Sequence, residues 1–274
     1  MKTPRTGRVA AHVFTYGSTL VFLLPVYILI NVAFRPADDL SAGLLPSSEP
    51  TLANFSKAWN ESGLPSAIVT SAIVTTLSCL AIVVLSTMAA YPLARSTARL
   101  SNVTFYLFLV GLLLPFQVAL LPLYLMMRDM QLLGTVWSLV IFYTGLQMPF
   151  SIFLVTTFLR TSVAVEYEEA ARIDGCSDLM AFVRVVVPLL RPVLGTLLIL
   201  NGVNVWNDFF TPLLYLAGSD LTTIPVEIYS FVGVYSTSWP LVFAALIISM
   251  IPILVLYLIF QRYVIQGFAS GLKG

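Results

Sequence analysis

Long apolar runs alternate with short polar segments along the 274-residue chain. A helix needs roughly 20 apolar residues to cross the hydrocarbon core of a bilayer, because each residue rises about 1.5 Å and every backbone polar group must be bonded within the segment. The pattern therefore predicts an all-α polytopic membrane protein. We expect six spans, at residues 10–33, 66–90, 103–127, 136–158, 192–216 and 241–262.

Composition supports this class of protein. Hydrophobic residues make up 58% of the chain, charged residues make up 10%, and the mean hydropathy is +0.93. Soluble globular domains are about 45–50% apolar, so a soluble fold is excluded. The first apolar run is too long for the core of a signal peptide, and Arg35-Pro36 follows it rather than a small-residue cleavage site. We therefore expect this run to remain as a membrane anchor.

Lysine and arginine are unevenly distributed between the predicted loops. Short cytoplasmic loops carry an excess of these bases, whereas acidic residues contribute little to orientation. With the N-terminus inside, three bases lie outside: Arg35, Lys57 and Arg128. Eleven lie inside: Lys2, Arg5, Arg8, Arg95, Arg99, Arg160, Arg172, Arg184, Arg191, Arg262 and Lys273. This distribution predicts that both termini are cytoplasmic.

The sequence lacks the common catalytic motifs. The only histidine is His12, so a zinc-binding H-E-x-x-H motif is excluded, and there is no G-x-S-x-G motif. None of the three lysines, Lys2, Lys57 and Lys273, stands in a phosphate-binding G-x-x-x-x-G-K-[ST] loop. We therefore expect no enzymatic activity and no cofactor in this chain; if ATP and magnesium drive it, another subunit must bind them.

The predicted loop at 159–191 is the longest one on the cytoplasmic side and is rich in charge. Its first half, "EYEEAARID", favours a helix, since Glu166, Glu168 and Glu169 would lie at the positive end of the helix dipole. Gly175 stands where a left-handed residue commonly ends a helix. The pattern predicts a short helix followed by a glycine elbow.

A second short helix is predicted after the elbow, with Ser177 or Asp178 as its N-cap and Pro188 as its end. It would carry an apolar stripe of Leu179, Phe182, Val183 and Val186. On the first helix, a low-relief face is expected from Tyr167, Ala170, Ala171 and Asp174. Two interpretations stay open: a docking surface for another protein, or a solvated helix that caps the bundle.

The string Glu169-Ala170-Ala171, three residues, Gly175, nine residues, and "VVVP" ending at Pro188 resembles the EAA motif of permease subunits in binding-protein-dependent ABC importers, E-A-A-x3-G-x9-I-x-L-P. Valine replaces the isoleucine and leucine of that pattern. The segments "AYPLAR" (90–95), "PLLRP" (188–192), "WNDFFTPL" (206–213) and "GFASGLKG" (267–274) resemble the sugar-permease branch. The resemblance covers the chain from about residue 10 onward.

The resemblance implies a type I ABC importer (MetI-like) transmembrane domain in a bacterial cell membrane. It implies three kinds of partner: a second homologous permease subunit, two ATPase subunits that bind ATP and magnesium, and an extracytoplasmic sugar-binding protein. The EAA loop would be the coupling helix that docks on an ATPase. Its implied contact residues are Glu169, Ala170, Ala171, Asp174 and Gly175, with Glu169 facing a basic group of the ATPase.

Polar side chains at membrane depth usually face the interior of the bundle or a water-filled path. In the fifth predicted span, Asn201, Asn204, Asp208 and Thr211 form a stripe, with Trp206 and Asn207 beside it. The stripe would either contact a sugar or serve packing and gating, because polar side chains also hydrogen-bond helices together. Two glutamines next to prolines are further candidates for the path: Gln117 near Pro115 and Gln147 near Pro149.

The expected organisation has three parts. Residues 1–65 hold the first span and an outer loop, 66–262 form a five-helix permease core with the loop 159–191, and 263–274 are a cytoplasmic tail. The outer segments 35–65 and 218–240 are candidate contacts for a binding protein. A non-sugar importer stays open. A secondary transporter is less favoured, because there is no internal repeat and Asp208 is the only ionisable candidate in a span.

Overall fold

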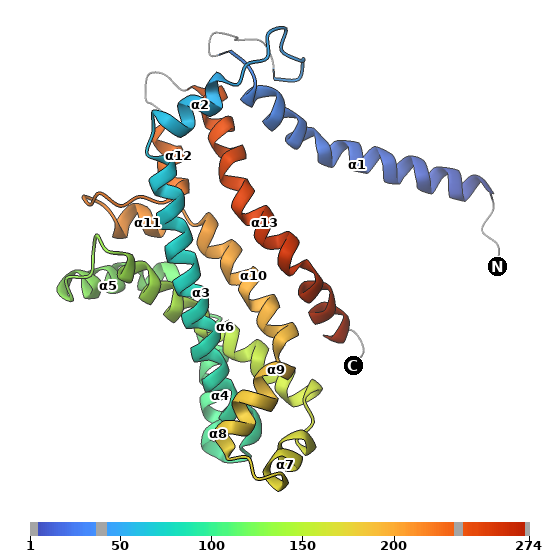
Figure 1. Cartoon of the computed structure of the whole chain (residues 1–274), viewed down its shortest axis with the longest axis vertical. Helices are drawn as coiled ribbons and strands as arrows, with labels where there is room; N and C mark the ends of the chain where they lie inside the picture. Colours follow the sequence, from blue (N-terminus) through green and yellow to red (C-terminus); the bar gives the residue numbers. More distant parts are fainter. Residues whose placement is uncertain (1–4, 37–42, 233–237, 272–274) are drawn as a thin grey trace. The chain divides into compact units, whose positions relative to one another are not determined.

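A computed structural model describes residues 5–36, 43–232 and 238–271, and it is helical, with no β-strand within these ranges (Figure 1). The chain divides into two compact units. The first comprises Met1–Pro65 and Glu227–Ile251, and the second comprises Ser66–Val226 and Pro252–Gly274. Segments that are distant in the sequence therefore contribute to each unit.

Three single helices are long and apolar enough to cross a bilayer, among the residues described. They lie in α1 (Arg5–Ala33), α3 (Leu64–Arg95) and α6 (Val136–Ser162). The last helix, α13 (Trp239–Gly271), has 33 residues and begins with the apolar stretch Trp239–Val255. The first three helices confirm three of the predicted spans, and the shorter apolar stretch of α13 lies at the position of the sixth. The predicted tail, 263–274, continues α13 as far as Gly271 and lies outside the described residues beyond it.

The third predicted span, 103–127, is not one continuous helix. The chain forms α4 (Arg99–Gly111) and α5 (Phe116–Asp129), whose axes are bent by 98° from each other. The break ends at Pro115, which has no backbone N–H and disfavours the helical conformation of the residue before it. The apolar run continues through the break, so hydropathy alone predicted a straight span.

The fifth predicted span, 192–216, is also interrupted. Helix α10 (Arg191–Asn207) ends where Asp208 adopts an extended conformation, and α11 (Phe210–Tyr215) follows. Asn201, Asn204, Asp208 and Thr211 therefore do not form a stripe along one helix, as the spacing predicted. Before α10, the helical stretch Asp178–Leu189 meets it at an angle of 69°. Counting each bent pair as one span gives five spans among the described residues, and the shorter apolar helix Trp239–Val255 lies where the sixth was predicted.

The second unit is packed through apolar clusters and small polar side chains. One cluster joins α3, α6 and α10 through buried residues that include Ala90, Leu159, Val163, Leu190 and Leu197. Lipid tails are as apolar as leucine, so close packing and hydrogen bonds between helices hold membrane helices together. Buried hydroxyl side chains on α3 and α6 fit this mode of packing: Thr70, Ser71, Thr75, Ser78, Ser86, Thr87, Ser138, Ser151 and Thr156.

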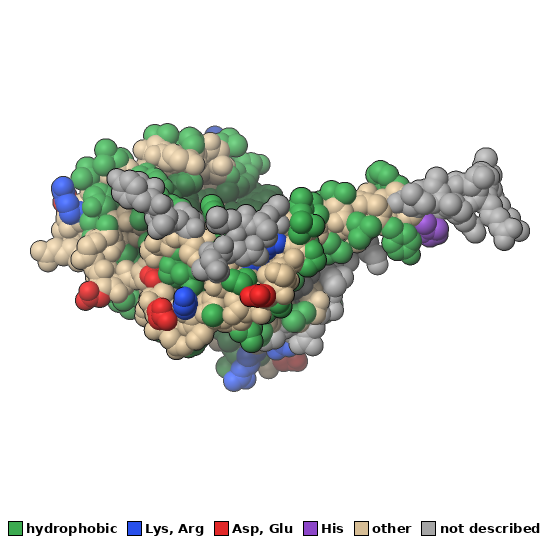
Figure 2. Space-filling model, turned by 90° about the horizontal axis from the view of Figure 1, so that it is seen from above, with side chains coloured by type: hydrophobic (Ala, Val, Ile, Leu, Met, Phe, Trp, Pro, Cys, Tyr) green, Lys and Arg blue, Asp and Glu red, His purple; other side chains and the backbone are tan. Residues whose placement is uncertain are grey.

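Large apolar side chains are exposed on several helices. Figure 2 shows hydrophobic side chains spread over the visible face, with charged side chains few and scattered. Within α1, Phe22 is 81% exposed and Phe14 is 77% exposed. Such exposure would be unfavourable in water but is expected for a helix that faces lipid.

In the first unit, asparagine side chains hold the segment after α1 in place. Asn31 donates to the carbonyls of Gly43 (2.7 Å) and Leu45 (2.6 Å), and Asn54, in α2 (Ala53–Asn60), donates to the carbonyls of Ala33 (2.9 Å) and Arg35 (2.6 Å). Side-chain hydrogen bonds therefore hold this part of the predicted outer segment 35–65, those of Asn54 being buried, while residues 37–42 lie outside the described residues. The outer segment 218–240 contains α12 (Ile224–Ser230), and its residues 233–237 likewise lie outside the description.

Candidate functional site

The charged loop forms the predicted helix, glycine elbow and second helix. Helix α7 (Glu166–Ile173) has its three glutamates in the first turn, and Gly175 has a φ of 86°, which a residue without a Cβ adopts freely. Helix α8 (Asp178–Ala181) begins at Ser177, whose Oγ accepts the N–H of Met180. Residues 166–189 are called the elbow segment below.

The predicted apolar stripe of the second helix is wrong in part. A π-helical turn, η1 (Phe182–Val186), follows α8 and rotates the side chains away from regular α-helical positions, since a π turn bonds residues five apart. Leu179 and Val183 are consequently exposed, whereas Ala181 and Val186 are buried. Pro188 does not end the helix, because it stands in the first turn of α9 (Val187–Leu189), where a missing N–H is tolerated.

The EAA residues of α7 do not all face the same way. Glu169, Ala170 and Asp174 are exposed, but Ala171 is buried, so the predicted face that included Ala171 is corrected. Two larger apolar side chains are exposed instead of Ala171: Ile173 in α7 is 86% exposed, and Leu179 in α8 is 73% exposed. The elbow surface is defined by these five exposed residues: Glu169, Ala170, Ile173, Asp174 and Leu179.

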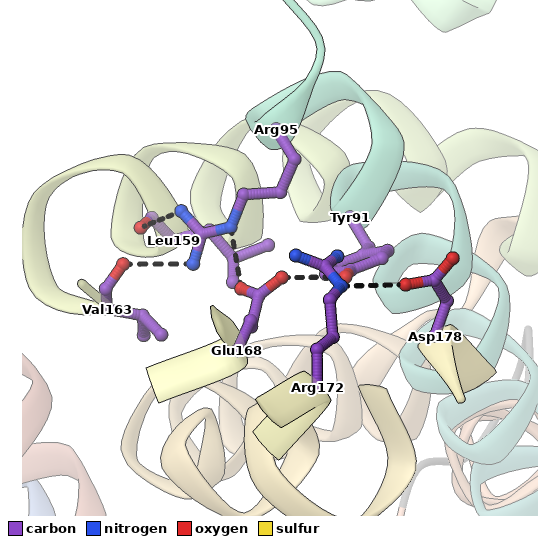
Figure 3. Close-up of polar contacts among 7 residues, drawn as sticks. All are labelled: Tyr91, Arg95, Leu159, Val163, Glu168, Arg172 and Asp178. Carbon is purple, nitrogen blue, oxygen red and sulfur yellow. Dashed lines mark hydrogen bonds and ion pairs between the residues drawn. The ribbon is translucent and has the colours of Figure 1, made fainter. Parts of the chain in front are cut away.

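Glu168, which sequence reasoning did not single out as a site, is the centre of a buried polar cluster (Figure 3). It is 1% exposed, and its two carboxylate oxygens have different partners. Arg95 Nε donates to Oε1 at 2.8 Å, and the hydroxyl of Tyr91 donates to Oε2 at 2.7 Å. The available signal was a base at the end of the second predicted span and an acid in the charged loop, both predicted on the same side of the membrane.

Arg95 also binds the end of α6. Its two terminal nitrogens donate to the carbonyls of Leu159 (3.3 Å) and Val163 (2.9 Å), which have no partner within the helix because α6 ends there. In the other direction, Arg160 of α6 donates to the carbonyl of Leu93 in α3 at 2.8 Å. The C-terminal ends of α3 and α6 are thus connected to each other, and Glu168 attaches α7 to α3 directly and to α6 through Arg95.

A second ion pair in the elbow segment is exposed. Arg172 Nε and Asp178 Oδ1 lie 2.8 Å apart, with side chains 45% and 81% exposed. The hydrogen bond to Asp178 raises the pKa of the Arg172 guanidinium. Because water and salt screen exposed charges, this pair holds α7 and α8 together only weakly.

A cavity of about 640 Å³ lies within the second unit, beside the two helix breaks. Its wall includes the bend between α4 and α5, the middle of α6, and the junction of α10 with α11. Five of the six predicted path residues line it: Gln117, Gln147, Asn204, Asn207 and Asp208. Aromatic rings come from Phe116, Tyr143 and Phe150, whereas Trp206, the aromatic residue beside the predicted stripe, is buried elsewhere.

The sixth predicted path residue, Asn201, does not line this cavity. Its side chain is 1% exposed, and its Nδ2 donates to Ser151 Oγ of α6 at 3.4 Å. An amide between two helices at this depth connects them. The packing interpretation therefore describes Asn201 better than contact with a transported solute.

Both oxygens of the Asp208 carboxylate are used in the fold. Oδ1 accepts the backbone N–H groups of Phe210 (3.0 Å) and Thr211 (3.4 Å), and Oδ2 accepts the hydroxyl of Tyr143 at 2.9 Å. An aspartate commonly begins a turn through such bonds to residues further along the chain. Asp208 thus starts α11 and ties the α10–α11 junction to α6. Within the described residues, no group of His, Cys, Asp and Glu side chains could hold a metal ion.

Comparison with known proteins identifies the family. The family described as "Binding-protein-dependent transport system inner membrane component" matches residues 82–270. The "Probable ABC transporter permease protein YurM" of Bacillus subtilis (strain 168) is 35% identical over 268 residues, covering 97% of this chain and 88% of that protein. The melibiose/raffinose/stachyose import permease protein MelC of the same organism is 33% identical over 248 residues, covering 90% of each.

A solved structure confirms the fold. It is a bacterial ABC transporter involved in the import of the acidic polysaccharide alginate, with a TM-score of 0.81 and 20% identity, and the similarity covers 96% of this chain and 99% of that one. The all-α, type I importer fold expected from the EAA resemblance is thus present. Together with the sequence matches, this shows that the chain belongs to the family of inner membrane components of binding-protein-dependent ABC transport systems.

Proposed function

We propose that this chain is a permease subunit of an ATP-driven ABC importer and forms half of the translocation path for a mono- or oligosaccharide. The observation that carries the proposal is the cavity at the two helix breaks, with its four amide side chains and three aromatic rings. Interrupted helices at membrane depth are typical of transport sites, because irregular backbone is tolerated where it lines a cavity.

The chemistry of the cavity suits a neutral polyhydroxylated solute. Gln117, Gln147, Asn204 and Asn207 each offer an amide that can donate to and accept from hydroxyl groups, and the rings offer flat apolar surfaces. Asp208 is the only acidic residue of the lining, and its oxygens already accept protein hydrogen bonds. MelC is named for the import of melibiose, raffinose and stachyose, and MsmG of Streptococcus mutans, 32% identical over 261 residues, for multiple sugars, which supports a sugar here.

The elbow surface would dock on an ATPase subunit. It combines two acidic and two large apolar side chains, all exposed, on a short helical hairpin, which fits a partner cleft with apolar walls and a basic group facing Glu169. That ATPase, in two copies, would bind the ATP and magnesium, and this chain would contribute no catalytic group. Closure of the ATPases would then drive alternating access of the cavity.

The remaining partners follow from the same proposal. A second homologous permease subunit would supply the other half of the path, and an extracytoplasmic sugar-binding protein would contact the segments 35–65 and 218–240. The bias of lysine and arginine supports cytoplasmic termini and a cytoplasmic elbow segment, where ATP is present.

The test is reconstitution of the complex in liposomes with its ATPase, partner permease and binding protein. We expect uptake of a labelled mono- or oligosaccharide that depends on ATP. Asn204→Ala should lower uptake, because it removes an amide from the cavity, whereas Asn102→Ala, an exposed amide of α4 outside the lining, should not. Uptake by this chain alone without ATP would show a secondary transporter instead, and uptake restricted to a non-sugar solute would refute the sugar.

A further inference from the structure

We propose that Arg95, Glu168 and Tyr91 form a rigid contact, called the joint below, that transmits movement of the elbow segment to α3 and α6. Arg95 is then a positioning residue, through which ATP hydrolysis is coupled to transport. The inference rests on the proposed function, since it assigns a role within that coupling. Nothing in the EAA pattern names these side chains: Arg95 and Tyr91 lie in α3, more than 70 residues from Glu168, at separations of 73 and 77.

The joint is largely buried, and both oxygens of its carboxylate accept a hydrogen bond. Each oxygen of Glu168 takes one short hydrogen bond, and the side chains of Glu168 and Arg95 are 2% and 15% exposed. If one partner is removed from a buried pair of this kind, the other charge is left without water to replace it, so breaking the pair is strongly unfavourable. The contact therefore stays closed when force is applied to α7.

The guanidinium of Arg95 connects three helices, α3, α6 and α7. The planar guanidinium directs its donors along fixed lines. In this structure Nε points to Glu168 of α7, while the two terminal nitrogens point to the carbonyls of Leu159 and Val163 at the end of α6 (Figure 3). Because Arg95 itself is the last residue of α3, one side chain fixes three helix ends relative to one another.

The rest of the attachment of α7 is weaker. The helix has only 8 residues, which is too short to be stable by its own hydrogen bonds. Its other ion pair, Arg172 with Asp178, is exposed, and the π turn η1 next to α8 departs from regular α-helical bonding. Glu168 is also the immediate neighbour of Glu169 on the elbow surface. Apolar packing also joins the elbow segment to α3, through the rings of Tyr91 and Phe182 at 4.8 Å, but Glu168 supplies the buried, directional contact of α7 itself. We therefore expect a push on the elbow surface to reach α3 and α6 through Glu168.

Three variants test the joint in the assembled complex. Arg95→Lys keeps the positive charge but loses the planar guanidinium that donates in three directions. Glu168→Gln removes the negative charge, and Tyr91→Phe removes the hydroxyl that donates to it. The measurement is the number of sugar molecules taken up per ATP hydrolysed in liposomes. We expect this ratio to fall about tenfold or more for Arg95→Lys and Glu168→Gln, and by about threefold for Tyr91→Phe, because the first two variants disrupt the buried ion pair, whereas Tyr91→Phe removes one hydrogen bond and leaves the pair in place.

Asp129→Asn is the matched control, because it breaks an Arg–Asp pair at 2.8 Å whose side chains are 58% and 67% exposed and which lies outside the elbow segment. It should leave the ratio unchanged. An unchanged ratio in Tyr91→Phe and in the other assembled variants would overturn the proposal. Loss of the ATPase from the purified complex of all three variants would also overturn it, because the cluster would then serve assembly alone.

Failure of the proposed function gives a different result. If the wild-type complex contains no ATPase, or takes up sugar without ATP, the importer itself is refuted before any variant is compared. If the wild-type complex is a coupled importer and the variants stay equally coupled, only the joint is refuted.

Discussion

Asp208 offers the sharpest test of how the polar residues of the cavity are used. Its carboxylate accepts from the backbone at the start of α11 and from the Tyr143 hydroxyl, which belongs to a side chain only 3% exposed. Asp208→Ala removes all of these acceptors. Asp208→Asn keeps an oxygen for the backbone N–H groups and places an amide beside Tyr143, whose oxygen can accept from it.

The expected magnitudes follow from these bonds. Loss of a side-chain acceptor at the start of a helix costs about 1 kcal/mol, and loss of a hydrogen bond to a charged group costs about 1.5–3 kcal/mol. We therefore expect the free energy of unfolding to fall by about 3 kcal/mol in Asp208→Ala. The same quantity should fall by about 1 kcal/mol in Asp208→Asn, because a neutral hydrogen bond replaces the charged one.

Thermal unfolding of the purified complex measures this difference, and ATP-driven uptake is measured on the same preparations. The shift in unfolding temperature should be about three times larger for Asp208→Ala than for Asp208→Asn. Asp208→Asn should retain most of the uptake, since the carboxylate serves the fold. Equal shifts for the two variants would refute the acceptor argument, and a stable Asp208→Asn complex without uptake would show that the carboxylate contacts the solute.

Three further predictions concern the elbow segment and its attachment. Gly175→Val should lower the free energy of unfolding by about 1–2 kcal/mol, because a residue with a Cβ is strained at a positive φ even though no other atom lies within 4 Å of that Cβ. Substrate-stimulated ATP hydrolysis should fall as well, and activity equal to that of the wild type would refute a rigid elbow. Leu159→Ala should destabilise the complex by about 2–5 kcal/mol in thermal unfolding, whereas Leu100→Ala, 76% exposed, should change it by less than about 0.5 kcal/mol. Ser177→Ala should cost about 1 kcal/mol by loss of the cap of α8, measurable as faster hydrogen exchange of the elbow segment, and unaltered exchange would contradict the capping role.

Much of the fold was predictable because membrane spans are long and uniform. The apolar runs in α1, α3 and α6 are each long enough to cross a bilayer, so hydropathy alone located them. The first break was missed for the same reason, because apolar residues continue through it, and the second was missed because Asn207 and Asp208 stand in a run that is otherwise apolar. Their chemical signals were local: a proline after three leucines at Pro115, and an aspartate at Asp208 that accepts the N–H groups of the residues after it.

The sequence predicted which residues belong to the candidate site, but it did not predict that they line one cavity. Gln117, Gln147 and Asn204 come from three different helices, and only the tertiary structure brings them to one cavity. The same limit explains Ala171 and Glu168, which stand between exposed neighbours in α7 yet are buried. Helical periodicity gives the faces of a helix, whereas the face that is covered depends on α3 and α6, which the local sequence does not contain.

The π turn at Phe182–Val186 has a consequence for the length of the chain. A π turn holds an extra residue relative to an α-helix, so deletion of one residue there would leave the helix continuous and regular. The wider turn absorbs the extra residue locally, so this deletion would leave α8 and α10 in nearly the same relative orientation. In contrast, deletion of one residue from the regular helix α10 would rotate everything before it by about 100°, the angle between successive residues of an α-helix. Helix α7 would then turn Glu168 away from Arg95 with every side chain of both still present. The π turn is therefore the place where this segment tolerates a change in length, whereas the regular helix beside it does not.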